Sequence, residues 1–515
     1  MITVPELARA AEKAFASIAS HPRLVEAEVF LAANTSLLAR LSYTSHIPSN
    51  GVEEPKSSEA YGIGIQAVFE SPAGRLLGFG SEPSDLSPAG AARALAKAEK
   101  AAVLDPEFVS LPEPALYERT LTDYHDPALG ALDDRALVEA GWKVATGAFR
   151  TFQCSTALAA IAGSDEGLRR LGLIVGGDVS MLLERIAIAS TRIPRVQSDE
   201  STLITASITA MVEARDAKGS GWWTGTRLAH LTDEAGGDAA ANAIAAIGGE
   251  RVPSGSYTVI FGHQPVADIL NNIVIPACTA SSFYSMNTPF LGKLGQTVAA
   301  PRLTIADDGA VPGYMGSKGI TCEGLPTGRT ELIRRGVLTG CLSSWYETMR
   351  LLHDGALAEK LGATGPSAAA ALVPRNGFRF GTGGGRQFDT SPGISASNVV
   401  VEGEDPVALP ELISRVRDGL YVGRIWYTYP INGLRAGDFT CTVVGDSHVI
   451  RDGRLAAPLA ANVIRISDNI LRFLPNVVGI SSATRGTTVW AADEVTYTPE
   501  LVVTGVPVEE IHITR

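Results

Sequence analysis

The stretch VIFGHQPVADILNNIVIP (259–276) decides the organisation of the second half of this chain. It overlaps SYTVIFG (256–262), an apolar and β-branched run that predicts a strand. A helix is predicted next, because apolar residues follow the spacing of one helix face at 266, 269, 270, 273 and 274. The residues PSG (253–255) predict a turn before the strand, so we divide the chain there into domains 1–250 and 251–515.

Helical and strand patterns alternate in the first half. VEAEVFLAA (25–33) and SLLARLSY (36–43) predict two strands, and LSPAGAARALAKAEKAA (86–102) predicts a helix with Ser87 as its N-cap. The second half holds many short apolar runs between Gly, Asp and Pro turns, which is typical of a β sandwich or barrel-like domain. We therefore predict an α+β protein, with an N-terminal α/β domain followed by a β-rich C-terminal domain.

Composition excludes several classes of function. The 515 residues carry a formal charge of −12 and no basic cluster, which argues against nucleic-acid binding. The five cysteines form no CxxC pair, so neither a zinc knot nor a disulfide framework is indicated. No run of about 18 apolar residues predicts a membrane span, and the N-terminus predicts an amphipathic helix and not a secretion signal. We expect a cytoplasmic protein.

Chemistry-bearing residues are present, but none forms a self-evident site. The eight histidines include no pair on one helix face, and His263 is expected to be a surface or capping residue. Asp307 and Asp308 end a predicted strand, where an Asx turn is expected in preference to a metal site. Cys322 is expected to be packed, and GTGGG (381–385) lacks the residues that complete a phosphate loop. No GxSxG accompanies the serines at 281, 282, 285, 343, 344, 481 and 482.

Longer motifs carry a resemblance to a known family. Besides the strand and helix at 256–276, they are LGKLGQTVAAPRLTIADDG (291–309), CEGLPTGRTELIRRGVLTGCL (322–342) and LPELISRVRDGLYVG (409–423). In this order they resemble the TldD/PmbA family of metallopeptidase-related proteins. Within that family the chain is similar to the PmbA type, also called TldE-like, which lacks the zinc-binding helix.

The resemblance implies where a zinc site would lie. TldD-type members carry HExxxH on the helix, with two zinc-binding histidines and a glutamate that acts as general base. The matching positions here are Asn271, Asn272 and Pro276, and we expect Pro276 to interrupt the last helical turn. The third ligand, a cysteine, falls in GISSATRGT (479–487), which offers Ser481 and Ser482. The resemblance therefore implies no metal on this chain and zinc on a TldD-like partner.

The resemblance also implies a function. We expect a heterodimer with a TldD-like zinc-binding chain that acts on unfolded peptides, or on an amide of a peptide-like natural product such as a lincosamide-type antibiotic intermediate. The aromatic stretch GRIWYTYPING (423–433) suggests cavity-lining roles for Tyr427, Tyr429 and Asn432. Two alternatives stay open: a metal-free hydrolase that uses a serine, Cys278 or the Asp307–Asp308 pair, and a peptide-binding scaffold without catalysis.

Overall fold

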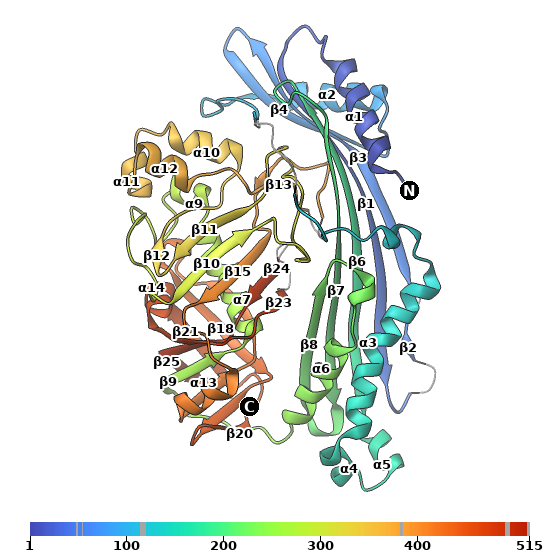
Figure 1. Cartoon of the computed structure of the whole chain (residues 1–515), viewed down its shortest axis with the longest axis vertical. Helices are drawn as coiled ribbons and strands as arrows, with labels where there is room; N and C mark the ends of the chain where they lie inside the picture. The colour runs from blue at the N-terminus through green and yellow to red at the C-terminus, as the bar shows by residue number, and fades with distance from the viewer. Residues whose placement is uncertain (48–49, 54, 114–119, 382–384, 490–494, 512–515) are drawn as a thin grey trace.

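The first half of the chain builds one long antiparallel sheet. The computed structural model describes residues 1–47, 50–53, 55–113, 120–381, 385–489 and 495–511. The strand order is β5-β4-β3-β1-β6-β7-β8, with β2 paired to β1 (Figure 1). The strands are β1 (Leu24–Thr44), β2 (Gly51–Val52), β3 (Lys56–Ser71), β4 (Gly74–Pro83), β5 (Val103–Leu104), β6 (Leu173–Ser190), β7 (Gln197–Val212) and β8 (Ala217–Gly225).

Strand β1 corrects the prediction of two separate strands at 25–33 and 36–43. It is a single strand of 21 residues, and its antiparallel register with β6 runs unbroken from the pair Glu28–Ser190 to the pair Thr44–Ile174. Asn34 and Thr35 lie between the two predicted runs. Asn34 is instead buried within the strand, where its side-chain amide donates to the carbonyl of Arg386 at 2.9 Å.

Helices cover one face of this sheet. Helices α1 (Val4–Ile18) and α2 (Pro88–Ala101) pack on one end, and α3 (Asp134–Cys154) and α6 (Glu234–Ala245) pack on the other (Figure 1). The predicted N-cap of α2 is confirmed, because Ser87 accepts a hydrogen bond from the Gly90 amide. None of the helices in the described ranges is both long and apolar enough to cross a bilayer.

The second half folds into two large sheets around a shared apolar core, and it also has a two-stranded sheet of β13 (Gly377–Phe378) and β14 (Gly393–Ile394). The six-stranded sheet has the order β12-β11-β10-β15-β24-β23, and the other has the order β17-β18-β21-β25-β9-β16-β19-β20 with β22 beside β25. The first comprises β10 (Leu303–Asp308), β11 (Arg329–Arg334), β12 (Val337–Leu338), β15 (Asn398–Gly403), β23 (Arg485–Thr488) and β24 (Val495–Thr498). The second comprises β9 (Gly255–Phe261), β16 (Gly419–Val422), β17 (Arg424–Pro430), β18 (Asp438–Gly445), β19 (His448–Arg451), β20 (Arg454–Pro458), β21 (Ile464–Asn469), β22 (Val477–Ile480) and β25 (Leu501–Glu510).

This arrangement confirms the predicted fold class, an α+β chain with a β-rich C-terminal half. The predicted boundary at 250/251 lies in the segment that connects α6 to β9. One large core cluster contains residues of both C-terminal sheets and of the segment that follows β9, so that segment lies between the sheets. This is the helix predicted at 266–276.

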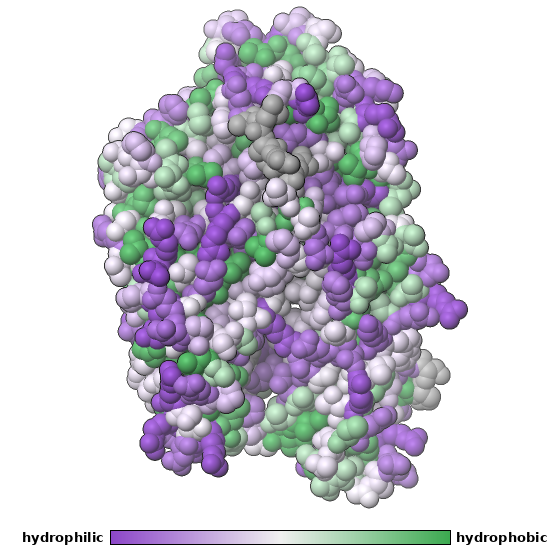
Figure 2. Space-filling model, in the orientation of Figure 1, coloured by the Kyte–Doolittle hydropathy of each residue, from purple (hydrophilic) through white to green (hydrophobic). Residues whose placement is uncertain are grey.

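Buried charges join the two halves. The face of the long sheet opposite its helices packs against the C-terminal half through apolar residues such as Phe30, Ile188 and Phe378. Beside them, Glu184 Oε2 lies 2.7 Å from Lys318 Nζ, and Asp199 Oδ2 lies 2.7 Å from Arg386 Nη1. We call these four charged residues the seam cluster. The space-filling view shows that the two halves separate at the bottom of the molecule, where the surface is hollowed between them (Figure 2).

Candidate functional site

The predicted helix is continuous but changes its winding at the candidate zinc-ligand positions. It begins as α7 (His263–Ile269), continues as the π-helical turn η4 (Leu270–Val274) and ends as α8 (Ile275–Ala277). A π turn has i→i+5 hydrogen bonds, so residues five apart lie one turn apart on the same face. Asn271 and Pro276 have this spacing, which is the spacing of the two histidines in HExxxH.

Pro276 does not interrupt the helix, contrary to expectation. A proline lacks an N–H donor, and its ring clashes with the carbonyl four residues earlier in a regular α-helix. The wider π turn directly before Pro276 makes room for the ring. The helix therefore continues to Ala277, and the proline changes the type of turn and not the length of the helix.

Asn271 is held by the neighbouring sheet. Its side chain is buried, and its Oδ1 accepts a hydrogen bond of 2.8 Å from the Thr496 hydroxyl on β24. The other side-chain atom, Nδ2, is also buried and has no hydrogen-bond partner in the described part of the chain. In this orientation the one acceptor atom of the amide is engaged by Thr496 and its N–H group is the free end, so Asn271 does not fit the role of a zinc ligand.

Asn272 belongs to a second polar cluster that sequence reasoning did not find. Its Nδ2 donates to the carbonyl of Asp268 at 2.8 Å and to Asp268 Oδ1 at 3.3 Å, while the Thr428 hydroxyl donates to Asp268 Oδ2. Burial raises the pKa of Asp268 to about 6, although both hydrogen bonds act in the opposite direction. Asn272 therefore orients a carboxyl group and cannot act as a base itself.

His263 starts the helix and joins it to the closing strands. Its Nδ1 lies 2.6 Å from the Thr498 carbonyl, and its Nε2 lies 3.2 Å from Glu500 Oε1. Ser481, at the predicted third-ligand position, donates its hydroxyl to the other oxygen of Glu500. Burial disfavours the Glu500 carboxylate, but the hydrogen bonds from His263 and Ser481 outweigh it and lower its pKa. The expectation of a surface or capping histidine is therefore wrong: the side chain is 19% exposed, and it bonds to the closing strands and does not cap α7.

This cluster has the residue types of a hydrolytic triad but not the geometry. A nucleophilic serine needs a histidine within hydrogen-bond reach of its hydroxyl. Here Glu500 lies between Ser481 and His263, so the carboxylate accepts the hydrogen bond from the serine. The arrangement fixes the start of the helix to the end of β22 and supplies no activated nucleophile.

The donor set at the helix does not fit zinc. Zinc sites in proteins use cysteine, histidine and carboxylate side chains that converge on one point. The matching positions hold two amides, a proline and two serines; the amides and Ser481 already have hydrogen-bond partners within the chain, and Ser482 is exposed. Across the ranges that the structure describes, no group of three or more His, Cys, Asp or Glu residues is placed to hold a metal ion.

The other candidate nucleophiles are structural. Cys278 and Cys322 are fully buried, and burial raises the pKa of each thiol to about 12. Asp307 is buried and accepts hydrogen bonds from Asn376 Nδ2 at 2.6 Å and from the backbone amide of Ser397 at 2.7 Å. Asp308 accepts from the Ala310 amide at 3.1 Å, which is the predicted Asx turn.

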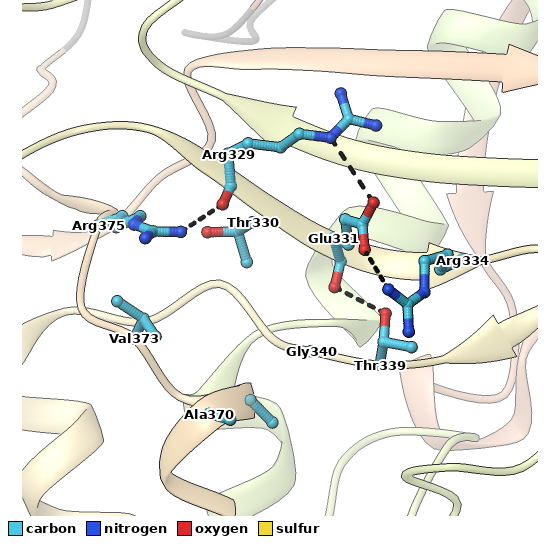
Figure 3. Close-up of a pocket in the computed structure, with 10 residues that line it drawn as sticks. Arg329, Thr330, Glu331, Arg334, Thr339, Gly340, Ala370, Val373 and Arg375 are labelled. Carbon is cyan, nitrogen blue, oxygen red and sulfur yellow. Dashed lines mark hydrogen bonds and ion pairs between the residues drawn. The ribbon is translucent and has the colours of Figure 1, made fainter. Parts of the chain in front are cut away.

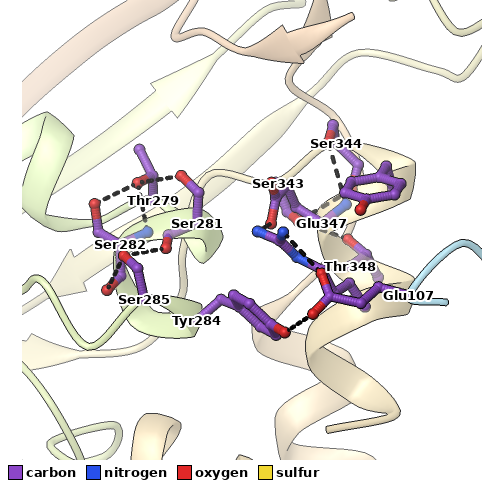
Figure 4. A network of polar contacts seen from close by, with 12 residues as sticks. Glu107, Thr279, Ser281, Ser282, Tyr284, Ser285, Ser343, Ser344, Glu347 and Thr348 are labelled. Atoms are coloured by element: carbon purple, nitrogen blue, oxygen red, sulfur yellow. Dashed lines mark hydrogen bonds and ion pairs between the residues drawn. The ribbon is translucent and has the colours of Figure 1, made fainter. Parts of the chain in front are cut away.

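The serines at 281, 282, 285, 343 and 344 lie in a network around helix ends (Figure 4). Ser282 donates to the carbonyl of Pro276 at 2.7 Å, and Ser344 caps α10 (Trp345–Leu352) by accepting from the Glu347 amide. In the same network the Tyr284 hydroxyl donates to Glu107, so a loop of the first half is tied to the second. These hydroxyls therefore serve packing and capping. The central residues of GTGGG (381–385) lie outside the described ranges.

The predicted cavity residues lie on an edge strand. Tyr427 and Tyr429 project from β17, with side chains 69% and 49% exposed, and Thr428 between them points inward to Asp268. Asn432 lies in the turn after β17, where its Nδ2 donates to Asp438 Oδ2 at 3.1 Å. Their role in lining a substrate cavity stays a prediction.

Comparisons with known proteins agree with this architecture. Residues 254–510 match the PmbA/TldA metallopeptidase C-terminal domain. The chain is 28% identical over 224 residues to the metalloprotease slr0863 of Synechocystis sp., covering 43% of this chain and 38% of that protein. It is 27% identical over 236 residues to a metalloprotease of Methanothermobacter thermautotrophicus, covering 45% of this chain and 44% of that protein. The matches thus span less than half the length of these relatives.

A solved structure extends the similarity to the whole fold. The crystal structure of TldE from Thermococcus kodakarensis superposes with a TM-score of 0.75 at 18% identity, covering 98% of this chain and 99% of that one. At this identity the match shows the fold and not the activity. With the domain match and the order of the motifs, it leads to one conclusion. The chain belongs to the TldD/PmbA family of metallopeptidase-like proteins.

Proposed function

We propose that this chain is the subunit without zinc in a two-chain metallopeptidase, where a TldD-like chain binds the metal. The observation that carries this proposal is the bond between Asn271 and Thr496 at the position of the first histidine of HExxxH. It uses the only lone-pair-bearing atom of that side chain for contact within the chain. The scaffold around the site is retained, as expected if its remaining role is to pack against an active partner.

The substrate of the pair is proposed to be an unfolded peptide or a peptide-like amide, for example an intermediate of a lincosamide-type antibiotic. The exposed tyrosines on β17 support this proposal, because aromatic side chains bind apolar and amide groups with little loss of conformational entropy. We place the pair in the cytoplasm. The metal-free hydrolase has less support, since Cys278, Asp307 and the serines at 281, 282, 285, 343, 344 and 481 are engaged or buried.

Co-expression with the TldD-like protein of the same genome tests the proposal. We expect a stable complex with about one zinc ion per pair, no zinc on this chain alone and peptide or amide hydrolysis only in the mixture. The control is a partner whose HExxxH glutamate is replaced by glutamine, which should form the complex without turnover.

Other outcomes favour the alternatives. Zinc on this chain alone contradicts the proposal. Hydrolysis by this chain alone that resists a chelator supports the metal-free hydrolase. Peptide binding without turnover in any mixture supports the scaffold.

A further inference from the structure

A groove with several arginines lies across β11, at an edge of the six-stranded sheet (Figure 3). Arg329, Thr330 and Arg334 enter it from β11, and Arg375 faces them from the segment after α12 (Gly365–Ala371). Strands β10 and β15 separate this groove from β24, which contacts Asn271. The groove is therefore distinct from the site described above.

Two of the three guanidinium groups are paired with carboxylates. Arg329 lies 2.8 Å from Glu402 and 3.8 Å from Glu331, and Arg334 lies 3.5 Å from the other oxygen of Glu331. Figure 3 shows Glu331 between these two arginines. Their charges are thus largely balanced within the groove.

Arg375 differs from its neighbours. Its Nη1 donates to the carbonyl of Arg329, and among the described residues no carboxylate lies within ion-pair distance of it. The side chain is only half-exposed. A guanidinium has five N–H donors in a planar fork that matches the two oxygens of a carboxylate or phosphate, so most of this fork is available.

The Thr330 hydroxyl is a second, independent feature of the groove. Thr330 is 7% exposed, and its Oγ1 is buried without a hydrogen-bond partner in the ranges described. In Figure 3 this hydroxyl lies on the side of the groove that faces Arg375. Buried hydroxyls are nearly always paired, so an unpaired one beside a guanidinium that has no carboxylate partner indicates a shared ligand.

We propose that this groove binds a small oxyanion, a carboxylate or a phosphate, that carries a short aliphatic group. The oxyanion accepts hydrogen bonds from the Arg375 fork and the Thr330 hydroxyl. The aliphatic group packs on Ala370 and Val373, which form the apolar wall opposite β11. Glu331 stands on the far side with its two arginines, so it does not repel the ligand from Arg375.

Calorimetry on the full chain tests the proposal, with propionate and inorganic phosphate as separate probes at constant ionic strength. We expect one of them to bind with a Kd of about 1 mM or below. Arg375→Gln and the near-isosteric Thr330→Val should each weaken that binding about tenfold. The control is Arg415→Gln on α13 (Leu409–Val416), which makes the same change in net charge outside the groove.

The two probes identify the oxyanion. Binding of propionate alone assigns the groove to carboxylates, and binding of phosphate alone assigns it to phosphoryl groups. Binding of neither probe overturns the proposal. So does binding that persists in both variants, or binding that Arg415→Gln weakens as much as Arg375→Gln does. Because the zinc-binding partner is not needed, the result does not depend on the proposed function.

Discussion

At the seam between the two halves, Glu184, Asp199, Lys318 and Arg386 are at most 3% exposed and form two ion pairs, whereas the first candidate ligand position on the helix buries the neutral amide of Asn271. In the seam, burial alone would raise the pKa of Glu184, but Lys318 and Arg386 lower it to about 2. In the helix, Asn271 has one neutral hydrogen bond. Buried charge is thus retained where it joins the halves and is missing where zinc would need it.

The largest expected effect comes from breaking the seam. Arg386→Met removes the cationic partner of Asp199 and one of the two cationic partners of Glu184, and leaves the buried Asp199 carboxylate without a paired positive charge. We expect the free energy of unfolding to fall by about 3–5 kcal/mol, measured by urea denaturation. Arg415→Gln breaks an exposed ion pair with Glu411 and should change the free energy of unfolding by less than about 0.5 kcal/mol. Equal effects of the two substitutions would show that the seam cluster adds no stability.

A smaller effect follows from Asp268, the buried carboxyl group on helix α7. The pKa of Asp268 is about 6 in the folded chain and 3.8 in the ordinary carboxyl, so the folded state keeps a proton that the unfolded state has lost. The contribution of Asp268 to the free energy of unfolding is therefore fully present below pH 3.8 and is lost as the pH rises through 6. The loss in free energy of unfolding should approach about 3 kcal/mol near neutral pH.

Asp268→Asn isolates this contribution, because asparagine keeps the shape and cannot ionise. The difference in unfolding free energy between variant and parent should shift in favour of the variant as the pH rises from about 4 to 7. Asp389→Asn, on a residue outside the site, serves as the control for a lost carboxyl. A pH-independent difference for Asp268→Asn would contradict the raised pKa.

The sequence predicts a structural feature when the contacts that form it are local, and misses it when its hydrogen-bond partner lies far away in the sequence. The helix at 266–276 was predicted from its apolar spacing, because that spacing reflects burial along one segment. Its π turn was not, since a change from i+4 to i+5 bonding barely alters an apolar pattern. The sequence pattern predicts two strands at 25–33 and 36–43, where the structure has the single strand β1. The carbonyl that satisfies Asn34 belongs to Arg386, 352 residues away, which no local pattern reveals.

The residues of the candidate site were likewise predicted only in part. The motif alignment placed Asn271, Asn272 and Pro276 on one helix, where the structure has them. Asp268 was missed because a lone aspartate on a helix gives no signal until Thr428 is known to face it. Alternation along β17 gave no clue either, because it would place Tyr427 on the same side as the buried Ile425, and the register shift between Trp426 and Tyr429 reverses that pattern. The sequence also gave no sign of Glu500, because its partner His263 lies on a different element, far away in the chain.

Loss of the hydrogen bond between Asn271 on the helix and Thr496 on β24 should have a moderate effect on stability. Asn271→Ala leaves the buried Thr496 hydroxyl without a partner, so we expect a loss of about 1–2 kcal/mol in unfolding free energy. Thr496→Val and the double variant complete a double-mutant cycle. The coupling energy should be about 1 kcal/mol, whereas a coupling near zero would mean that this bond does not hold the helix.

The smallest expected effect lies on the edge strand and has opposite signs at two neighbouring tyrosines. Tyr427 has φ = 55°, in the left-handed region that a side chain disfavours, and Tyr429 does not. Tyr427→Gly should therefore stabilise the chain by up to about 1 kcal/mol, and Tyr429→Gly should destabilise it by a similar amount. Thermal unfolding of both variants measures this. If Tyr427→Gly also weakens the complex with the zinc-binding partner or its turnover, the strained tyrosine is retained for function, since stability alone favours glycine there.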